Sequence, residues 1–235
     1  TGGPGTGKTT TLNAIISLLE ESGAKIALAA PTGRAAKRMS ELCGRETKTI
    51  HRLLEVEWGE DDKQRFKKNE KNPLEFDCIV VDELSMMDIG LFEALLKAMT
   101  VNCRLILVGD VDQLPSVGAG NVLNDIIESN IVPVIRLKKV FRQAQRSYIV
   151  TNAHRIIGGE MPVVSKEEDC DFFVTDSRNA DKLIASLYCE RLPLKYGFTP
   201  ENIQVLCPSR KMKTGTVNIN NILQSIINPE NKMTK

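Results

Sequence analysis

The chain has 235 residues, of which 42% are apolar and 26% are charged, as in an ordinary soluble globular protein of one large or two small domains. Its net charge of +1 excludes a global field that steers the protein to nucleic acid, so any such site must be local. The sequence contains neither a signal peptide nor an apolar run long enough to cross a bilayer, which predicts a cytoplasmic protein without a membrane partner. The scattered cysteines predict buried free thiols, and the presence of only His51 and His154 argues against a histidine-based metal site.

The first ten residues, TGGPGTGKTT, match the phosphate-binding pattern G-x-x-x-x-G-K-[ST]. Lys8 is expected to reach the β- and γ-phosphates of ATP, and the Thr9 hydroxyl is expected to hold Mg²⁺. An amphipathic helix follows, so its positive N-terminal end would face the phosphates. The alternative is a glycine-rich turn before an ordinary helix. The predicted nucleotide-binding residues are Gly2, Gly3, Pro4, Gly5, Thr6, Gly7, Lys8, Thr9 and Thr10.

A phosphate-binding loop normally follows a buried strand, and here nothing precedes Thr1. We therefore expect the sequence to be an internal piece of a longer protein.

Residues 25–30 predict a buried strand that leads into PTGRAAKRM and a helix. Thr32, Gly33 and Arg34 would lie at the carboxyl end of this strand, where open α/β sheets place ligand contacts. Small and cationic groups at a helix start suit a phosphodiester backbone, although a simple strand-to-helix turn explains them equally well. In the next segment, KTIHRLL, His51 is more typical of a capping or packing residue than of a residue that contacts a base.

Residues 55–73 are polar and carry Trp58, the only tryptophan of the chain. A turn-like GEDD separates two short alternating stretches, which predicts a protruding β-hairpin. A disordered charged loop is the competing interpretation.

The segment FDCIVVDELSMMD predicts a core strand with Asp82 and Glu83 at its carboxyl end. Because adjacent strand residues point to opposite faces, the two carboxylates can serve different targets. Asp82 would anchor Mg²⁺ through water, and Glu83 would orient and deprotonate the attacking water. A solvated turn at a strand end is the alternative.

Residues 105–108 predict another buried strand, and Gln113 follows its end by a few residues. A neutral amide there can contact a γ-phosphate or the attacking water without acting as a base. Since such a contact exists with ATP and is lost with ADP, Gln113 is a candidate switch residue.

From Ser129 to Gly159 the chain has basic residues and no acidic one. A solvated basic face is the usual explanation, but the run coincides with an expected strand at 134–137 and an expected helix, so we predict a second domain from about residue 135. Arg142 is the candidate arginine finger for the γ-phosphate. Further expected elements are strands at 172–174 and 203–207 and helices at 181–192 and near 222–226, which continue an α/β pattern.

Taken together, the motifs resemble those of RecD-type superfamily 1 DNA helicases, the family of the exodeoxyribonuclease V alpha subunit. GGPGTGKTT resembles motif I, PTGRAAKRM motif Ia, TIHRLL motif Ib, VVDELSMMD motif II, GDVDQLPSVGAGNVL motif III and FRQAQRS motif IV. A weaker match covers residues 207–224, and we find no counterpart of motifs V and VI.

The resemblance implies a P-loop NTPase with a RecA-like parallel sheet flanked by helices at 1–134, followed by an incomplete second RecA-like domain at 135–235. It assigns ATP-site roles to Lys8, Thr9, Asp82, Glu83, Gln113 and Arg142. It places Thr32, Gly33, Arg34, Thr49 and His51 on the DNA side, and residues 55–73 where the family inserts its strand-separating pin.

The function implied is ATP-dependent translocation on single-stranded DNA, 5′ to 3′, with strand separation at duplex junctions in recombination and repair. Partner subunits of a larger complex are possible, and the chain by itself is not expected to unwind DNA. Two alternatives remain: a ring-forming AAA-type ATPase, and a nucleotide-gated DNA-binding subunit without turnover. ATP and Mg²⁺ are the expected cofactors.

Overall fold

The computed structural model describes residues 1–59, 64–141, 146–164, 170–175 and 177–228. The chain divides into two compact units, Thr1–Phe172 and Phe173–Lys235, and each is described by itself. The expected domain boundary at 134/135 stays a prediction. Within the described residues, no helix combines the length and the apolar character that crossing a membrane requires.

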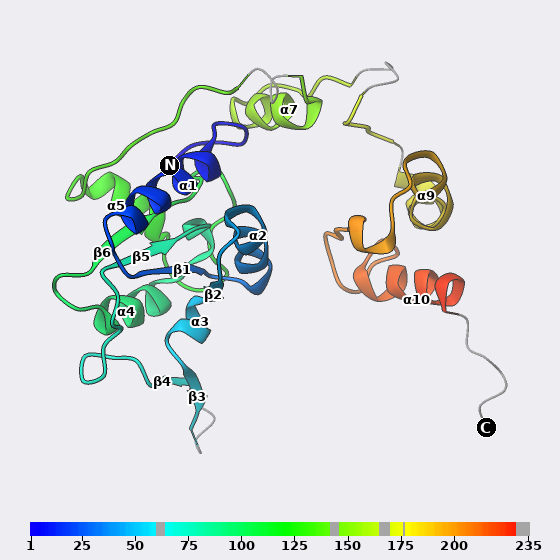
Figure 1. The fold of residues 1–235 in the computed structure, drawn as a ribbon. Coiled ribbons are helices and arrows are strands. Elements are labelled where there is room, and N and C mark those ends of the chain that lie inside the picture. The colour runs from blue at the N-terminus through cyan, green and yellow to red at the C-terminus, as the bar shows by residue number, and fades with distance from the viewer. Residues whose placement is uncertain (60–63, 142–145, 165–169, 176, 229–235) are drawn as a thin grey trace. The chain divides into compact units, whose positions relative to one another are not determined.

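The first unit is built on a parallel four-stranded sheet in the order β2-β1-β5-β6 (Figure 1). The register places Leu28 of β1 opposite Thr47 of β2 on one side and Val80 of β5 on the other. Parallel strands that neighbour one another need crossover connections, which helices supply here. The strands are β1 (Ile26–Ala30), β2 (Thr47–Thr49), β5 (Cys78–Val81) and β6 (Arg104–Leu107).

Helices cover both faces of this sheet, because its central strands are apolar at every position (Figure 1). On one face α1 (Lys8–Glu21) and α2 (Gly33–Cys43) pack over Leu28 and Val80. On the other face three helices pack over Ile79 and Val81, and these are α3 (Ile50–Leu53), α4 (Ile89–Ala98) and α5 (Val122–Ser129). This three-layer α/β architecture confirms the predicted fold class of the first unit.

Strands β3 (Val56–Trp58) and β4 (Gln64–Phe66) form the predicted β-hairpin, whose ribbon extends away from the main sheet (Figure 1). Val56 pairs with Phe66 in its antiparallel register. Backbone amides of Lys67 and Lys68 donate to the carbonyls of Glu55 and Leu54 at 3.2 and 3.1 Å and close the hairpin base. Residues 60–63 lie outside the described residues.

The strand expected at 134–137 is absent; Leu137 makes only an isolated parallel bridge to Gly2. The terminal amino group of Thr1 donates to the Ile135 carbonyl at 2.8 Å, and the Leu137 amide donates to the Thr1 carbonyl at 2.8 Å. Residues 135–137 therefore run beside the start of the phosphate-binding loop. The expected helix after them is confirmed as α7 (Tyr148–Ile157).

The second unit is helical in its described residues, and its expected strands at 172–174 and 203–207 are absent. A strand needs neighbouring strands to pair with, and the described part of this unit contains no sheet. The expected helices are present, and α10 packs against α8. Its helices are α8 (Ala180–Ser186), a π-helical stretch (Leu187–Arg191), α9 (Leu192–Tyr196) and α10 (Thr216–Ile227).

Candidate active site

The glycine-rich loop turns directly into α1, because Gly7 adopts a left-handed conformation (φ 84°, ψ 24°) at the helix N-cap. A side chain resists this backbone geometry, whereas glycine adopts it readily. The Thr6 hydroxyl is buried and donates to the Gly3 carbonyl at 2.8 Å, which fixes the loop across its width. The first amides of α1 and its positive dipole end therefore face the space above the loop, as anion binding requires.

Lys8, the first residue of α1, bends back over this loop. Its ammonium group donates to the carbonyls of Gly2 at 2.6 Å and Gly3 at 3.1 Å. It also lies 3.8 Å from Oδ2 of Asp110, a carboxylate that is only 3% exposed. The role of Asp110 was missed from the sequence, although its position at the end of a buried strand was a usable signal.

Asp82 and Glu83 follow β5 directly, at the carboxyl end of the sheet. Oδ1 of Asp82 accepts a hydrogen bond from the Glu83 amide at 2.9 Å. Glu83 itself has φ 55° and ψ 42°, a left-handed conformation that costs an L-residue about 1–2 kcal/mol. Its Oε2 atom is buried and has no hydrogen-bond partner among the described residues. An acid that combines backbone strain with an unpartnered buried oxygen fits a functional role.

Burial raises the pKa of both carboxyls above their ordinary range. For Glu83 the loss of solvent is the main cause, and the charge of the adjacent Asp82 adds to it. The positive charge of Lys8 acts in the opposite direction on both groups. Lys8 is therefore close enough to influence both acids, and the phosphate-binding loop and the acidic pair share one electrostatic environment.

Gln113 lies in the loop after β6 and connects to the turn after Glu83. The Ser85 hydroxyl donates to the side-chain Oε1 of Gln113 at 3.5 Å. The backbone amide of Gln113 donates to the backbone carbonyl of Asp110 at 3.3 Å. Its side chain is otherwise exposed. The Gln113 side chain is thus connected to the turn that follows Glu83 through Ser85, a residue that the sequence did not single out.

Two residues far along the chain contact the phosphate-binding loop. The Phe141 amide donates to the Gly5 carbonyl at 3.1 Å, and a ring nitrogen of His154 lies 3.1 Å from the Pro4 carbonyl. A Cβ on Gly7 would come within 2.6 Å of the Phe141 ring, and one on Gly3 within 2.9 Å of His154. A side chain at either position would therefore displace these rings, and at Gly7 it would also have to adopt the left-handed backbone conformation. Arg142, the predicted arginine finger, lies outside the described residues.

The residues predicted to hold Mg²⁺ are compatible with that ion. Magnesium in nucleotide sites takes one or two protein oxygens and completes its shell with phosphates and water. Thr9 offers a hydroxyl one residue after Lys8, and Asp82 offers a carboxylate at the adjoining strand end. Among the described residues there is no group of three or more acidic, histidine or cysteine side chains that could hold a metal by itself.

Three of the five residues predicted on the DNA side, Thr32, Thr49 and His51, have structural roles in the fold. The Thr32 hydroxyl caps α2 by accepting from the Ala35 amide at 3.3 Å, and the Thr49 hydroxyl caps α3 by accepting from the Arg52 amide at 3.2 Å. The His51 ring packs against Phe66 of the hairpin, with 6.0 Å between ring centroids. Gly33 and Arg34 are exposed at the start of α2. These contacts fit the alternative interpretations, which are a strand-to-helix turn at Thr32 and packing at His51. A DNA contact by these residues stays a prediction.

Comparisons with known proteins identify the family of this chain. A family model described as "AAA domain" matches residues 1–119. The chain belongs to this family. Its sequence is 38% identical over 229 residues to the ATP-dependent RecD2 DNA helicase of Deinococcus radiodurans, covering 97% of this chain and 30% of that protein. It is also 36% identical over 265 residues to the RecBCD enzyme subunit RecD of Mycobacterium tuberculosis strain CDC 1551, covering 96% of this chain and 45% of that protein.

These relatives confirm the resemblance to RecD-type helicases, and the chain spans less than half of their length. Among solved structures, a Pif1 helicase at forked double-stranded DNA matches 81% of this chain and 47% of its own, with 21% identity and a TM-score of 0.45.

Proposed function

We propose that the protein containing this chain is an ATP-driven DNA helicase of the RecD type. The observation that carries the proposal is the position of Lys8, which bends over the phosphate-binding loop beside Asp110 and whose charge acts on the half-buried acids Asp82 and Glu83. A cation, a strained acid with an unpartnered oxygen and a helix N-terminus at one sheet edge suit the hydrolysis of a nucleoside triphosphate.

In this proposal the loop amides and Lys8 hold the β- and γ-phosphates of ATP. Thr9 and Asp82 hold Mg²⁺, which would neutralise charge on the phosphates when bound. Glu83 positions the attacking water and accepts its proton, because its unpartnered Oε2 is available for that bond. Gln113 contacts the γ-phosphate or the attacking water, so the loop after β6 responds to whether ATP or ADP is bound. Arg142 is proposed to neutralise the charge that develops in the transition state.

The proposed substrate is single-stranded DNA next to a duplex junction, by the resemblance to RecD-type helicases, and one relative is named a DNA helicase. The chain offers an exposed arginine, Arg34, at the start of α2, and an aromatic side chain, Trp58, that is 73% exposed on the hairpin. Nucleobases stack on exposed aromatic rings irrespective of sequence. We propose a 5′-to-3′ direction, a cytoplasmic location and partner subunits on the same basis of resemblance.

The decisive experiment is strand displacement by the intact protein on duplexes with a 5′ or a 3′ overhang, together with phosphate release with and without single-stranded DNA. We expect ATP-dependent displacement from the 5′ overhang and DNA-stimulated turnover. DNA binding that changes with ATP but shows no turnover would replace the helicase by a nucleotide-gated binding subunit.

Light scattering measures the oligomeric state of the protein in the presence of ATP. Assembly into a hexamer would instead favour a ring-forming ATPase.

Trp58 provides an independent measurement, since it is the only tryptophan of the chain. If other parts of the intact protein add tryptophans, these are replaced by phenylalanine first. We expect stacking with a junction to quench Trp58 emission, and an unchanged spectrum with the junction bound would contradict a role of the hairpin in strand separation.

A further inference from the structure

A hollow of about 330 Å³ lies at the base of the hairpin, apart from the acidic pair and the phosphate-binding loop. Its position follows from the strand ends. Lys25 directly precedes β1 and Phe76 lies just before β5, so the hollow is at the amino ends of strands whose carboxyl ends carry Thr32 and Asp82. The volume falls at the small end of the range for ligand pockets, about 300–1,000 Å³.

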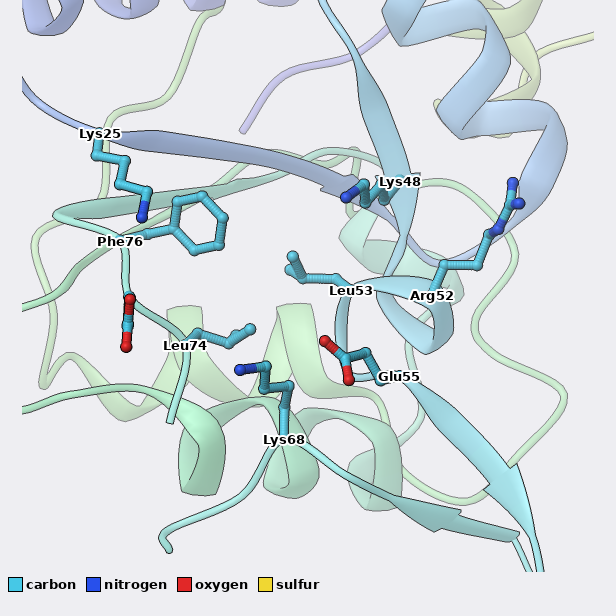
Figure 2. Close-up of a pocket in the computed structure, with 9 residues that line it drawn as sticks. Lys25, Lys48, Arg52, Leu53, Glu55, Lys68, Leu74 and Phe76 are labelled. Atoms are coloured by element: carbon cyan, nitrogen blue, oxygen red, sulfur yellow. The ribbon is translucent and has the colours of Figure 1, made fainter. Parts of the chain in front are cut away.

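Three lysines from different segments surround this hollow. Lys25 comes from the loop before β1, Lys48 from the middle of β2 and Lys68 from the chain just after β4. Figure 2 shows their amino groups around one space, whereas the Arg52 guanidinium points away from it. These lysines are 20 or more positions apart in sequence. The fold therefore brings their charges together, and the cluster does not come from a local run of basic residues.

The carboxylates of the hollow compensate its positive charge only in part. Glu55 and Glu75 line it too, but within the described chain neither makes an ion pair with the three lysines. The Lys48 ammonium has a neighbour outside the hollow, Glu46 at 3.7 Å, and both side chains are largely solvated. Such surface pairs contribute little, so Lys48 remains available to an anion.

Backbone hydrogen bonds hold the walls of the hollow in place. The Lys25 amide donates to Oδ2 of Asp77 at 2.7 Å, while the Asp77 amide donates to the Lys25 carbonyl at 2.8 Å. The Leu74 amide donates to the Ala98 carbonyl of α4 at 2.7 Å. The positions from which the lysines extend are thus fixed, and only their flexible stems must order on binding.

The floor is apolar and partly aromatic. Leu53 and Leu74 are buried there, and the Phe76 ring lies 5.3 Å from the Lys25 ammonium. In Figure 2 these three side chains lie between the lysines. A cationic rim over an apolar floor suits a sugar-phosphate unit, which has an anionic side and an apolar side.

We propose that this hollow binds a backbone phosphate of a forked DNA substrate beside the hairpin. The site would lie outside the path that the single strand follows across the protein. The inference rests on the proposed function, since a strand parted at the hairpin carries its phosphates past the hairpin base. Lys68 belongs to that base, because its amide closes the hairpin on Leu54. The ligand chemistry is a phosphate group, whether from a DNA backbone or from free phosphate.

The test compares the intact protein with the variant Lys25→Gln/Lys48→Gln/Lys68→Gln. A matched control, Lys97→Gln/Lys182→Gln/Lys195→Gln, removes the same charge from exposed positions of α4, α8 and α9. Fluorescence anisotropy measures affinity for a labelled fork and for a short single strand between 0.05 and 0.3 M salt, about the range in which phosphate contacts dominate.

We expect the pocket variant to bind the fork about ten- to a hundredfold more weakly at 0.1 M salt, and the slope of log affinity against log salt to fall by about 2 to 3. Binding to the short strand and DNA-stimulated turnover should stay within about twofold, and the control should behave as wild type. A variant with three arginines at these positions should restore the fork affinity, because arginine keeps the charge.

Equal fork affinity of the pocket variant and the control would overturn the proposal while leaving the helicase function intact. A failure of wild-type protein to bind any DNA would instead refute the proposed function. Thermal shift with inorganic phosphate separates the two sources: if phosphate alone stabilises the wild type but not the variant, and the fork affinity is unchanged, the site serves a free anion and the DNA assignment is wrong.

Discussion

The acidic pair after β5 and the threonines that start α2 and α3 both lie at carboxyl ends of strands, yet their side chains are used differently. Oε2 of Glu83 is buried and has no hydrogen-bond partner in the part of the chain that the structure describes, and the residue is held in a strained conformation. The hydroxyls of Thr32 and Thr49 already accept hydrogen bonds from helix amides. A buried oxygen without such a partner suits contact with a ligand or water, whereas a capping hydroxyl is explained by the helix it starts.

The largest effect is expected from Glu83→Gln. The amide cannot accept a proton from water, so DNA-stimulated phosphate release should fall by about 10²- to 10⁴-fold. Stability should change little, because Glu83 makes no side-chain cap bond to the turn that follows. Glu93→Gln in α4 is the control, as it removes an exposed carboxylate paired with Lys97. Near-normal turnover in Glu83→Gln would show that this acid is not the base.

The pH dependence of turnover should distinguish a buried base from an exposed one. Burial raises the pKa of Glu83 above the ordinary 4.5, and a base loses activity when it is protonated. Turnover should therefore fall about tenfold per pH unit on the acid side, starting at a higher pH than for a solvated glutamate. In terms of stability the sign is opposite: because the folded chain binds this proton more tightly, the contribution of Glu83 to folding weakens as pH rises through the raised pKa. A profile whose acid side begins to fall no higher than for a solvated glutamate would contradict the assignment.

A smaller effect is expected from Gln113→Ala, since it removes the side chain that Ser85 contacts and leaves the phosphate-binding loop unaltered. ATP affinity should stay within about twofold, while the change of DNA affinity on ATP binding should shrink by about fivefold or more, an ordinary size for coupling between sites. Titrating DNA with and without a non-hydrolysable ATP analogue measures both quantities. An unchanged shift in DNA affinity would exclude the switch role.

The smallest effect separates capping from DNA contact at Thr49. Thr49→Ala should cost about 1 kcal/mol of folding free energy by loss of the cap. Thr49→Asp preserves the cap but adds a negative charge, so it should keep the melting temperature and lower the affinity for single-stranded DNA by several-fold. If Thr49→Asp binds DNA as wild type does, Thr49 serves only as a helix cap. Its role would then be purely structural, in contrast to the functional role proposed for Glu83.

Much of the first unit was predictable because its patterns are local. The segments around residues 26–30 and 78–81 are continuous apolar runs, and the motif GTGKT specifies both the loop and the first helix. The hairpin at 55–73 was predicted from two alternating stretches around a turn. Such signals need no knowledge of distant residues.

The remaining features depend on distant partners. Residues 134–137 read as a strand, but the described structure pairs them only with Thr1 and Gly2. Asp110 and Ser85 acquire their significance from Lys8 and Gln113, which the fold brings beside them. The packing of Phe141 and His154 on the glycine loop also spans more than 130 positions of sequence and left no local trace.

The bent conformation of Lys8 has a kinetic consequence. Its ammonium group already has two carbonyl acceptors and a nearby carboxylate, so an incoming triphosphate competes with ligands that the protein itself provides. The measured dissociation constant of ATP is then weaker than the intrinsic one by the fraction of molecules whose lysine is released. Asp110→Ala would raise that fraction and would also remove a negative charge near the pocket, so nucleotide association would accelerate.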